Sequence, residues 1–147
     1  LPAVQRVWFR GAARASSEVL RALEEASLVV IGPSNPYVSI EPILALPGIR
    51  ERVRDKPVLA VSPIVHGRAV KGPLAGMLQT LGQMPASAAS VATHYGNLLR
   101  GYVVERGDDA GLALPVLATD TIMRTRAQSR RLAEDILAFA AELAVWA

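Results

Sequence analysis

The sequence predicts an α/β fold, namely a three-layer, Rossmann-like domain whose mostly parallel sheet has helices on both faces. Two short runs, 28–31 and 58–61, are apolar throughout and are typical of strands buried on both sides. Segments with helical periodicity separate these runs from each other and from later apolar runs. Each run leads into a polar, proline-containing loop, as strands do at the ligand-binding edge of such a sheet.

The chain opens with a predicted strand over 4–10, a helix over about 17–26 and a strand over 28–31. Ser16 or Ser17 begins the helix, because a serine hydroxyl can accept a hydrogen bond from a free N–H group of the first turn. An apolar stripe with helical spacing fits this helix to lie on a sheet. The stripe consists of Val19, Leu20, Leu23 and Ala26.

The remaining elements continue this alternation. In order, they are a helix-rich segment over 39–56 interrupted at Pro47-Gly48, a strand over 57–65, a helix from Pro73 to about Leu81, a helix capped by Ser87, strands over 102–104 and 114–118, and a helix over about 126–146. Ser39 is a predicted N-cap, and Pro73 suits a first helical position, where its missing N–H would have no partner. Charges of alternating sign over 50–55 predict a solvated face.

The last predicted helix is amphipathic. Arg130 with Glu134 and Arg131 with Asp135 are spaced i,i+4 and predict ion pairs worth a few tenths of a kcal/mol each. The inward residues are Leu132, Ile136, Phe139, Ala140 and Leu143.

Length and composition exclude several classes of protein. With 147 residues, the chain is about one domain long. It contains no cysteine, which excludes disulfides and thiolate chemistry, and we expect a cytoplasmic protein. No apolar run approaches the ~18 residues of a membrane span. The net charge is only +3, and the arginines are not interleaved with aromatic residues, so we expect no nucleic-acid partner.

The loop after the first apolar run is the most informative stretch. Two prolines and a glycine stiffen residues 32–36, so Ser34 and Asn35 are displayed in a fixed geometry before a helix start. A strand, a rigid polar loop and a helix N-terminus together form an anion-accepting crevice. Alternatively, Ser34 and Asn35 only stabilise the loop through side-chain turns.

The loop over 62–73 contains no acid and two cations, Arg68 and Lys71. Only two of the 16 basic residues are lysines, and Lys71 directly precedes Gly72-Pro73 at a predicted helix start. A lysine in this place is a mobile point charge suited to a phosphate. The alternative is a solvent-facing lysine beside a tight turn.

Three other residues are candidates for chemistry. His66 shares the second loop with the two cations and is a possible substrate contact, whereas His94, within a helix, is expected to be a packed or surface residue. Asp120 follows a strand and either meets a ligand or caps the next helix. No serine-hydrolase motif or paired-carboxylate signature is present, which disfavours a nucleophilic hydrolase.

Three sets of residues resemble a known family. They are Gly32-Pro33-Ser34-Asn35-Pro36 with Ser39-Ile40 and Pro42-Ile43-Leu44, then Ser62-Pro63-Ile64 with Lys71-Gly72-Pro73, then Asp120-Thr121-Ile122-Met123. In this order they resemble the CofD-like 2-phospho-L-lactate transferases. The family's N-terminal Gly-rich turn has no counterpart here, so residues 1–147 are expected to be the C-terminal part of one CofD-like domain, without turnover on their own.

The resemblance implies an enzyme of coenzyme F-420 biosynthesis. Such an enzyme moves a phospholactyl or phosphoenolpyruvyl group from a guanosine-diphospho donor to the deazaflavin Fo, releasing GMP. It also implies Mg²⁺, with ligands outside this chain, and a homodimer. The residues expected to bind substrate or phosphate are Gly32, Pro33, Ser34, Asn35, Ser62, Lys71 and Gly72, with Ser39, His66, Arg68 and Asp120 as further candidates.

A sister group, the YvcK-like regulatory proteins, shares this layout and binds nucleotide-sugars without turnover. Its first loop typically reads Gly-Pro-Gly-Ser. The Asn35-Pro36 pair therefore favours the transferase, and the non-catalytic binder is the alternative.

Overall fold

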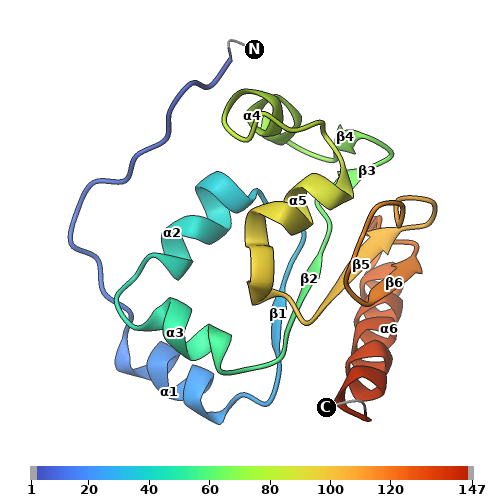
Figure 1. Ribbon diagram of the computed structural model, residues 1–147. Coiled ribbons are helices and arrows are strands. Elements are labelled where there is room, and N and C mark those ends of the chain that lie inside the picture. Colours follow the sequence, from blue (N-terminus) through green and yellow to red (C-terminus); the bar gives the residue numbers. More distant parts are fainter. Residues whose placement is uncertain (1–2, 146–147) are drawn as a thin grey trace.

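The computed structural model describes residues 3–145 and contains a four-stranded, all-parallel sheet (Figure 1). Its strands lie in the order β1 (Val29–Ile31), β2 (Val58–Val61), β5 (Gly101–Glu105) and β6 (Val116–Thr119). Helices flank the sheet on both faces, which confirms the predicted Rossmann-like α/β class. All four strands point the same way, so the loops that follow them meet at one edge.

Helices fill most of the chain between the strands. They are α1 (Ser17–Glu25), the π-helix η1 (Pro36–Ile40), α2 (Glu41–Leu44), α3 (Ile49–Arg54), α4 (Leu74–Thr80), α5 (Ala88–Tyr95), the 3₁₀ turn η2 (Gly96–Leu98) and α6 (Arg126–Val145). Ser16 caps α1 and Ser87 caps α5, as predicted. Residue 146, the predicted end of the last helix, lies outside the described residues.

The two faces of the sheet have separate cores. Along β2, Val58 and Ala60 pack on the side that carries α2 to α5, whereas Leu59 and Val61 pack against α6. The inward stripe predicted for α6 is confirmed, since Leu132, Ile136 and Phe139 are buried and Ala140 and Leu143 pack against them. Both predicted i,i+4 ion pairs of α6 are also present.

The strand predicted over 4–10 is absent. These residues have no regular secondary structure and run as an extended segment along the outside of the molecule (Figure 1), where the Val4 carbonyl accepts a hydrogen bond from the Thr80 hydroxyl at 2.6 Å. Trp8 and Phe9 are more than half exposed. A strand needs a neighbour to accept its backbone hydrogen bonds, and within residues 3–145 the edge strand β1 pairs only with β2.

The strand predicted over 57–65 is also wrong in extent. It ends at Val61, and residues 64–69 form a short hairpin of β3 (Ile64–Val65) and β4 (Arg68–Ala69). His66 and Gly67 make its two-residue turn with positive φ angles of 48° and 75°. The sequence does not predict this turn, because two-residue hairpin turns favour Asn-Gly or Asp-Gly and histidine is uncommon with positive φ. Asp108 stabilises it by accepting a hydrogen bond from the His66 N–H at 2.7 Å.

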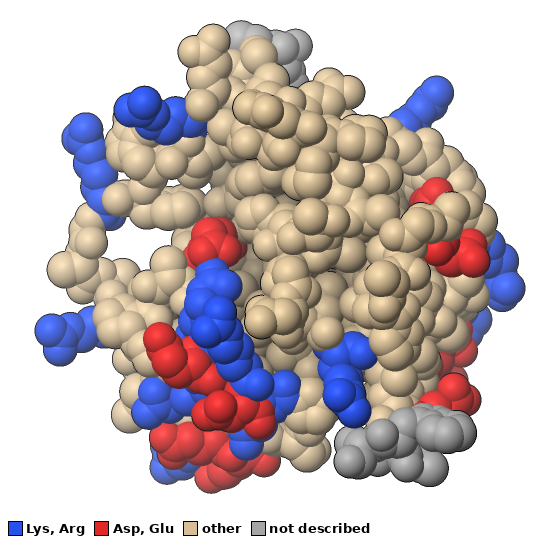
Figure 2. Space-filling view, viewed as in Figure 1, with Lys and Arg blue, Asp and Glu red and all other residues tan. Residues whose placement is uncertain are grey.

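Charged side chains of both signs are interleaved on the surface over α1 and α3 (Figure 2). Arg52 pairs with Glu24 at 3.4 Å, and Arg50 pairs with Glu41. This agrees with the charged, solvated face predicted for residues 50–55. None of the helices within residues 3–145 combines the length and the hydropathy that a membrane-spanning helix needs.

Candidate functional site

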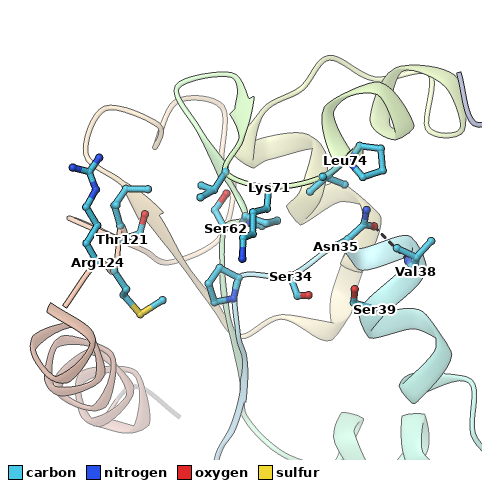
Figure 3. Close-up of a pocket in the computed structure, with 16 residues that line it drawn as sticks. Ser34, Asn35, Val38, Ser39, Ser62, Lys71, Leu74, Thr121 and Arg124 are labelled. Atoms are coloured by element: carbon cyan, nitrogen blue, oxygen red, sulfur yellow. Dashed lines mark hydrogen bonds between the residues drawn. The ribbon is translucent and has the colours of Figure 1, made fainter. Parts of the chain in front are cut away.

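A cavity of about 600 Å³ lies at the carboxyl edge of the sheet (Figure 3). Its walls come from the loops after β1, β2 and β6 and from the segment that enters α4. The lining residues are Pro33, Ser34, Asn35, Val38, Ser39, Ser62, Pro63, Val70, Lys71, Gly72, Pro73, Leu74, Thr121, Ile122, Met123 and Arg124. The two loops singled out in the sequence therefore meet around one cavity, as parallel strands dictate.

Most of the predicted site residues line this cavity. They are Pro33, Ser34, Asn35, Ser62, Lys71 and Gly72, together with the further candidate Ser39. Gly32 lies just before the lining residues of the first loop. His66, Arg68 and Asp120 are not among the lining residues: the first two belong to the hairpin β3–β4, and Asp120 is turned toward Arg106 at 3.0 Å.

Asn35 is the N-cap of η1, a role that the sequence suggested for Ser39. The Asn35 Oδ1 atom accepts hydrogen bonds from the Tyr37 and Val38 N–H groups, at 2.9 and 3.3 Å, while its Nδ2 contacts the Met77 sulfur at 3.3 Å. Ser39 is instead inside the helix. The cap falls on Asn35 because Pro36 takes the first helical position, where it needs no hydrogen-bond acceptor. Asn35 therefore shapes the loop and occupies the helix N–H groups itself.

Replacing Asn35 by alanine is expected to lower the free energy of unfolding by about 0.5–2 kcal/mol, because two N–H groups lose their acceptor. Asn35→Asp keeps a cap oxygen and should cost much less. Urea unfolding of the two variants checks this. Equal stability of Asn35→Ala and the parent would show that the cap contributes nothing.

Ser62 is also committed to internal bonds. Its hydroxyl donates to the Ile64 carbonyl at 2.9 Å and accepts from the Ile64 N–H at 3.1 Å, and the residue is buried. These two bonds between the Ser62 hydroxyl and the Ile64 backbone form a turn that ends β2 and sets the direction of the following loop. Ser62 thus lines the cavity with a hydroxyl that is already hydrogen-bonded to Ile64.

Among the cavity-lining residues of the first two loops, Lys71, Ser34 and Ser39 have polar side chains that are free for a ligand. Within residues 3–145, none of the three has a side-chain hydrogen bond, and Lys71 has no acid within ion-pair distance. Figure 3 shows the Lys71 side chain reaching into the cavity between Ser62 and Ser34. Lys71 is exposed, and it directly precedes Gly72, whose φ of 69° turns the chain into α4.

A third wall, Thr121–Arg124, was only partly anticipated. The sequence pointed to Asp120, but the residues that reach the cavity are the next four. Arg124 stands at the far rim and adds a second cation (Figure 3). Exposed apolar side chains complete the lining; they are Val38, Val70 and Met123. The sequence alone does not predict that these apolar side chains are exposed, because apolar residues that follow a strand are usually expected to be buried in the core.

His94 packs beneath the first loop, as expected for a helical histidine. Its ring lies edge-on to Tyr37 with centroids 4.6 Å apart. Burial lowers the pKa of His94, so its neutral form supports η1 near neutral pH. No group of three His, Asp or Glu side chains in residues 3–145 is placed to hold a metal ion.

Comparison with known proteins gives consistent matches. The family described as 2-phospho-L-lactate transferase CofD matches residues 2–131. A 2-phospho-L-lactate transferase of Halobacterium salinarum is 40% identical over 134 residues, covering 90% of this chain and 39% of that protein. The enzyme of the same name from Methanosarcina acetivorans is 39% identical over 144 residues, covering 92% and 47%.

A phosphoenolpyruvate transferase of Thermobifida fusca is 46% identical over 97 residues, covering 65% of this chain and 30% of that protein. The chain thus spans less than half the length of each of these three relatives.

Proposed function

Because the chain belongs to the CofD family of 2-phospho-L-lactate transferases, we propose that it forms part of such a transferase. The proposed reaction moves a phospholactyl or phosphoenolpyruvyl group from a guanosine-diphospho donor to the deazaflavin Fo, as a step of coenzyme F-420 biosynthesis. A hydroxyl oxygen of Fo bonds to the phosphorus that bears the organic acid. The bond from that phosphorus to the bridging oxygen breaks, and GMP leaves with the electron pair while the hydroxyl proton passes to solvent.

The observation that carries this proposal is the free cation Lys71 in a cavity built from three loops at the carboxyl edge of the sheet. Phosphoryl transfer needs neutralisation of the charge on the phosphates more than it needs a protein nucleophile. Lys71 supplies that charge next to the donor, and Ser34 and Ser39 supply hydroxyl donors on the opposite wall.

The apolar part of the lining suits the other substrate. Val38, Val70 and Met123 leave much of their side chains exposed around the cavity. The face of a planar aromatic ring system such as a deazaflavin would cover them, which favours binding because apolar surface is removed from water. We therefore assign the diphosphate to the Lys71 side and the acceptor ring to this apolar rim.

Two parts of the proposal rest on the family alone. Mg²⁺ is proposed as a cofactor, but residues 3–145 offer no cluster of carboxylates or histidines that fits it. The roles assigned to this chain therefore use only its own side chains. A homodimer is likewise proposed, and sedimentation of the natural polypeptide would test it.

The direct test is calorimetry with GDP on the natural polypeptide that contains these residues, with Mg²⁺ present. Saturable binding at or below millimolar GDP is expected, and absence of binding at millimolar GDP would contradict the proposal. Product formation from Fo and the activated donor then separates a transferase from a binder without turnover. The transferase names of the relatives favour turnover.

A further inference from the structure

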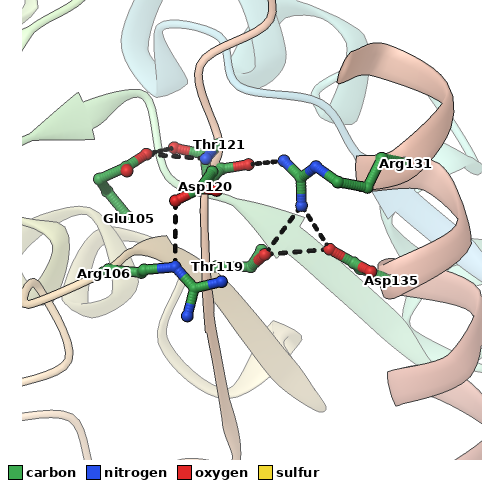
Figure 4. A network of polar contacts seen from close by, with 7 residues as sticks. All are labelled: Glu105, Arg106, Thr119, Asp120, Thr121, Arg131 and Asp135. Atoms are coloured by element: carbon green, nitrogen blue, oxygen red, sulfur yellow. Dashed lines mark hydrogen bonds and ion pairs between the residues drawn. The ribbon is translucent and has the colours of Figure 1, made fainter. Parts of the chain in front are cut away.

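The third wall of the cavity, Thr121–Arg124, makes no backbone hydrogen bonds of the kind found in helices and sheets. It joins the end of β6 to the start of α6 and contains no regular secondary structure. Because its N–H and C=O groups are not paired within a sheet or helix, hydrogen bonds from side chains contribute strongly to its position. Figure 4 shows the network of side chains behind it.

Glu105, the last residue of β5, holds the start of this wall. Its Oε2 atom accepts two hydrogen bonds from Thr121, one from the N–H and one from the hydroxyl, both at 2.7 Å. Thr121 is only 5% exposed. Bonds to a charged acceptor that are shielded from water are stronger than neutral ones, so Glu105 fixes both the backbone and the rotamer of Thr121.

Arg131 of α6 holds the residues just before the wall. It donates to the Asp120 carbonyl and, through Nη1, to the Thr119 hydroxyl at 3.0 Å. The same Nη1 atom donates to the Asp135 carboxylate at 2.6 Å, and the Thr119 hydroxyl donates to that carboxylate at 2.9 Å. The predicted i,i+4 pair of Arg131 and Asp135 is thus half-buried and tied to the sheet.

The far end of the wall is fixed by a capping box. Gln128 accepts hydrogen bonds from the Arg124 and Thr125 N–H groups at 2.8 and 3.0 Å, and the Gln128 N–H donates to the Thr125 hydroxyl at 3.2 Å. Both ends of the wall are therefore anchored, and all four of its residues line the cavity.

We propose that Glu105 is a positioning residue for the donor and acceptor site. It does not line the cavity, but through Thr121 it sets where the wall with Met123 and Arg124 stands. The effect on a ligand rests on the proposed function, whereas the effect on the wall itself does not. Both hydrogen bonds from Thr121 end on one oxygen of Glu105. A glutamine at position 105 has one such acceptor oxygen and carries no charge.

The test compares Glu105→Ala and Glu105→Gln with Arg106→Ala. Arg106 is the neighbouring residue, and it pairs with Asp120 on the same segment. Both partners are about two-thirds exposed, so this ion pair contributes little to the position of the wall.

GDP affinity is measured by calorimetry on the natural polypeptide. Glu105→Ala is expected to raise the Kd about tenfold, the loss of a charged hydrogen bond. Glu105→Gln should restore most of the affinity, and Arg106→Ala should leave it within about twofold.

Hydrogen exchange of the Thr121 amide provides a readout without ligand. Glu105→Ala should raise its exchange rate at least tenfold, while Arg106→Ala should not. A folded Glu105→Ala variant with unchanged exchange and Kd would overturn the inference. If Glu105→Ala does not fold, Glu105→Met decides, because it keeps the length of the side chain and removes the oxygen that accepts both bonds. An unchanged exchange rate of the Thr121 amide in that variant would equally overturn the inference. If Glu105→Ala changes the exchange rate of the Thr121 amide but the parent protein binds no GDP, the proposed function is contradicted and the anchoring of the wall by Glu105 still holds.

Discussion

Replacing Lys71 by alanine is expected to weaken GDP binding by about 5- to 150-fold without lowering the melting temperature. The range corresponds to about 1–3 kcal/mol, typical for a hydrogen bond to a charged group. The fold should not change, because Lys71 is exposed and has no ion-pair partner within residues 3–145. Calorimetry and thermal unfolding of the same sample measure the two quantities.

Lys56, the other lysine of the chain, is the matched control. It lies outside the cavity lining and donates a hydrogen bond to the Glu24 carbonyl at 2.8 Å. Lys56→Ala removes the same charge from the molecule, so it should leave the Kd unchanged apart from a small long-range effect. A lower melting temperature for Lys71→Ala with an unchanged Kd would make Lys71 a structural residue.

The sequence predicted the parallel sheet, and the meeting of two loops at its carboxyl edge, because both depend on local patterns. Continuous apolar runs gave β1 and β2, and the polar loops that follow them meet because parallel strands share an edge. Ser16 and Ser87 were predictable as caps, since a cap depends only on the residue and the turn after it.

The errors concern interactions between distant residues. The segment 4–10 has the composition of a strand, but within the described residues it has no partner strand. The hairpin at His66 depends on Asp108, 42 positions away. Asp120 was a candidate because a carboxylate after a strand often meets a ligand, and only the structure shows that Arg106 bonds to its carboxylate and Arg131 to its carbonyl.

Asn35 and Ser34 have different roles in the first loop, and only their contacts in the structure distinguish them. Asn35 and Ser34 were indistinguishable as ligands or turn formers, because both side chains serve either purpose. The structure separates them: the Asn35 amide caps η1, whereas Ser34 makes no side-chain hydrogen bond within residues 3–145. Rigidity of the loop thus comes from Asn35 and the prolines, and Ser34 is the group that it presents.

The largest loss of stability is expected from Leu132→Ala on α6. Leu132 is 2% exposed and packs with residues of β2 and β5 on the face of the sheet that α6 covers. Truncating a buried leucine leaves a cavity and costs about 2–5 kcal/mol. Leu137 is 60% exposed on the same helix, and Leu137→Ala should change the free energy of unfolding by no more than about 0.5 kcal/mol.

Urea unfolding of the two leucine variants isolates the contribution of burial. Both substitutions exchange the same side chains within one helix, so the difference in helix propensity cancels between them. A shifted midpoint with an unchanged dependence on urea identifies a true loss of native stability. Equal losses for the two variants would mean that α6 does not pack on the sheet through this face. The hydrogen bond from Arg131 of α6 to the Thr119 hydroxyl depends on the same packing and would then be in doubt as well.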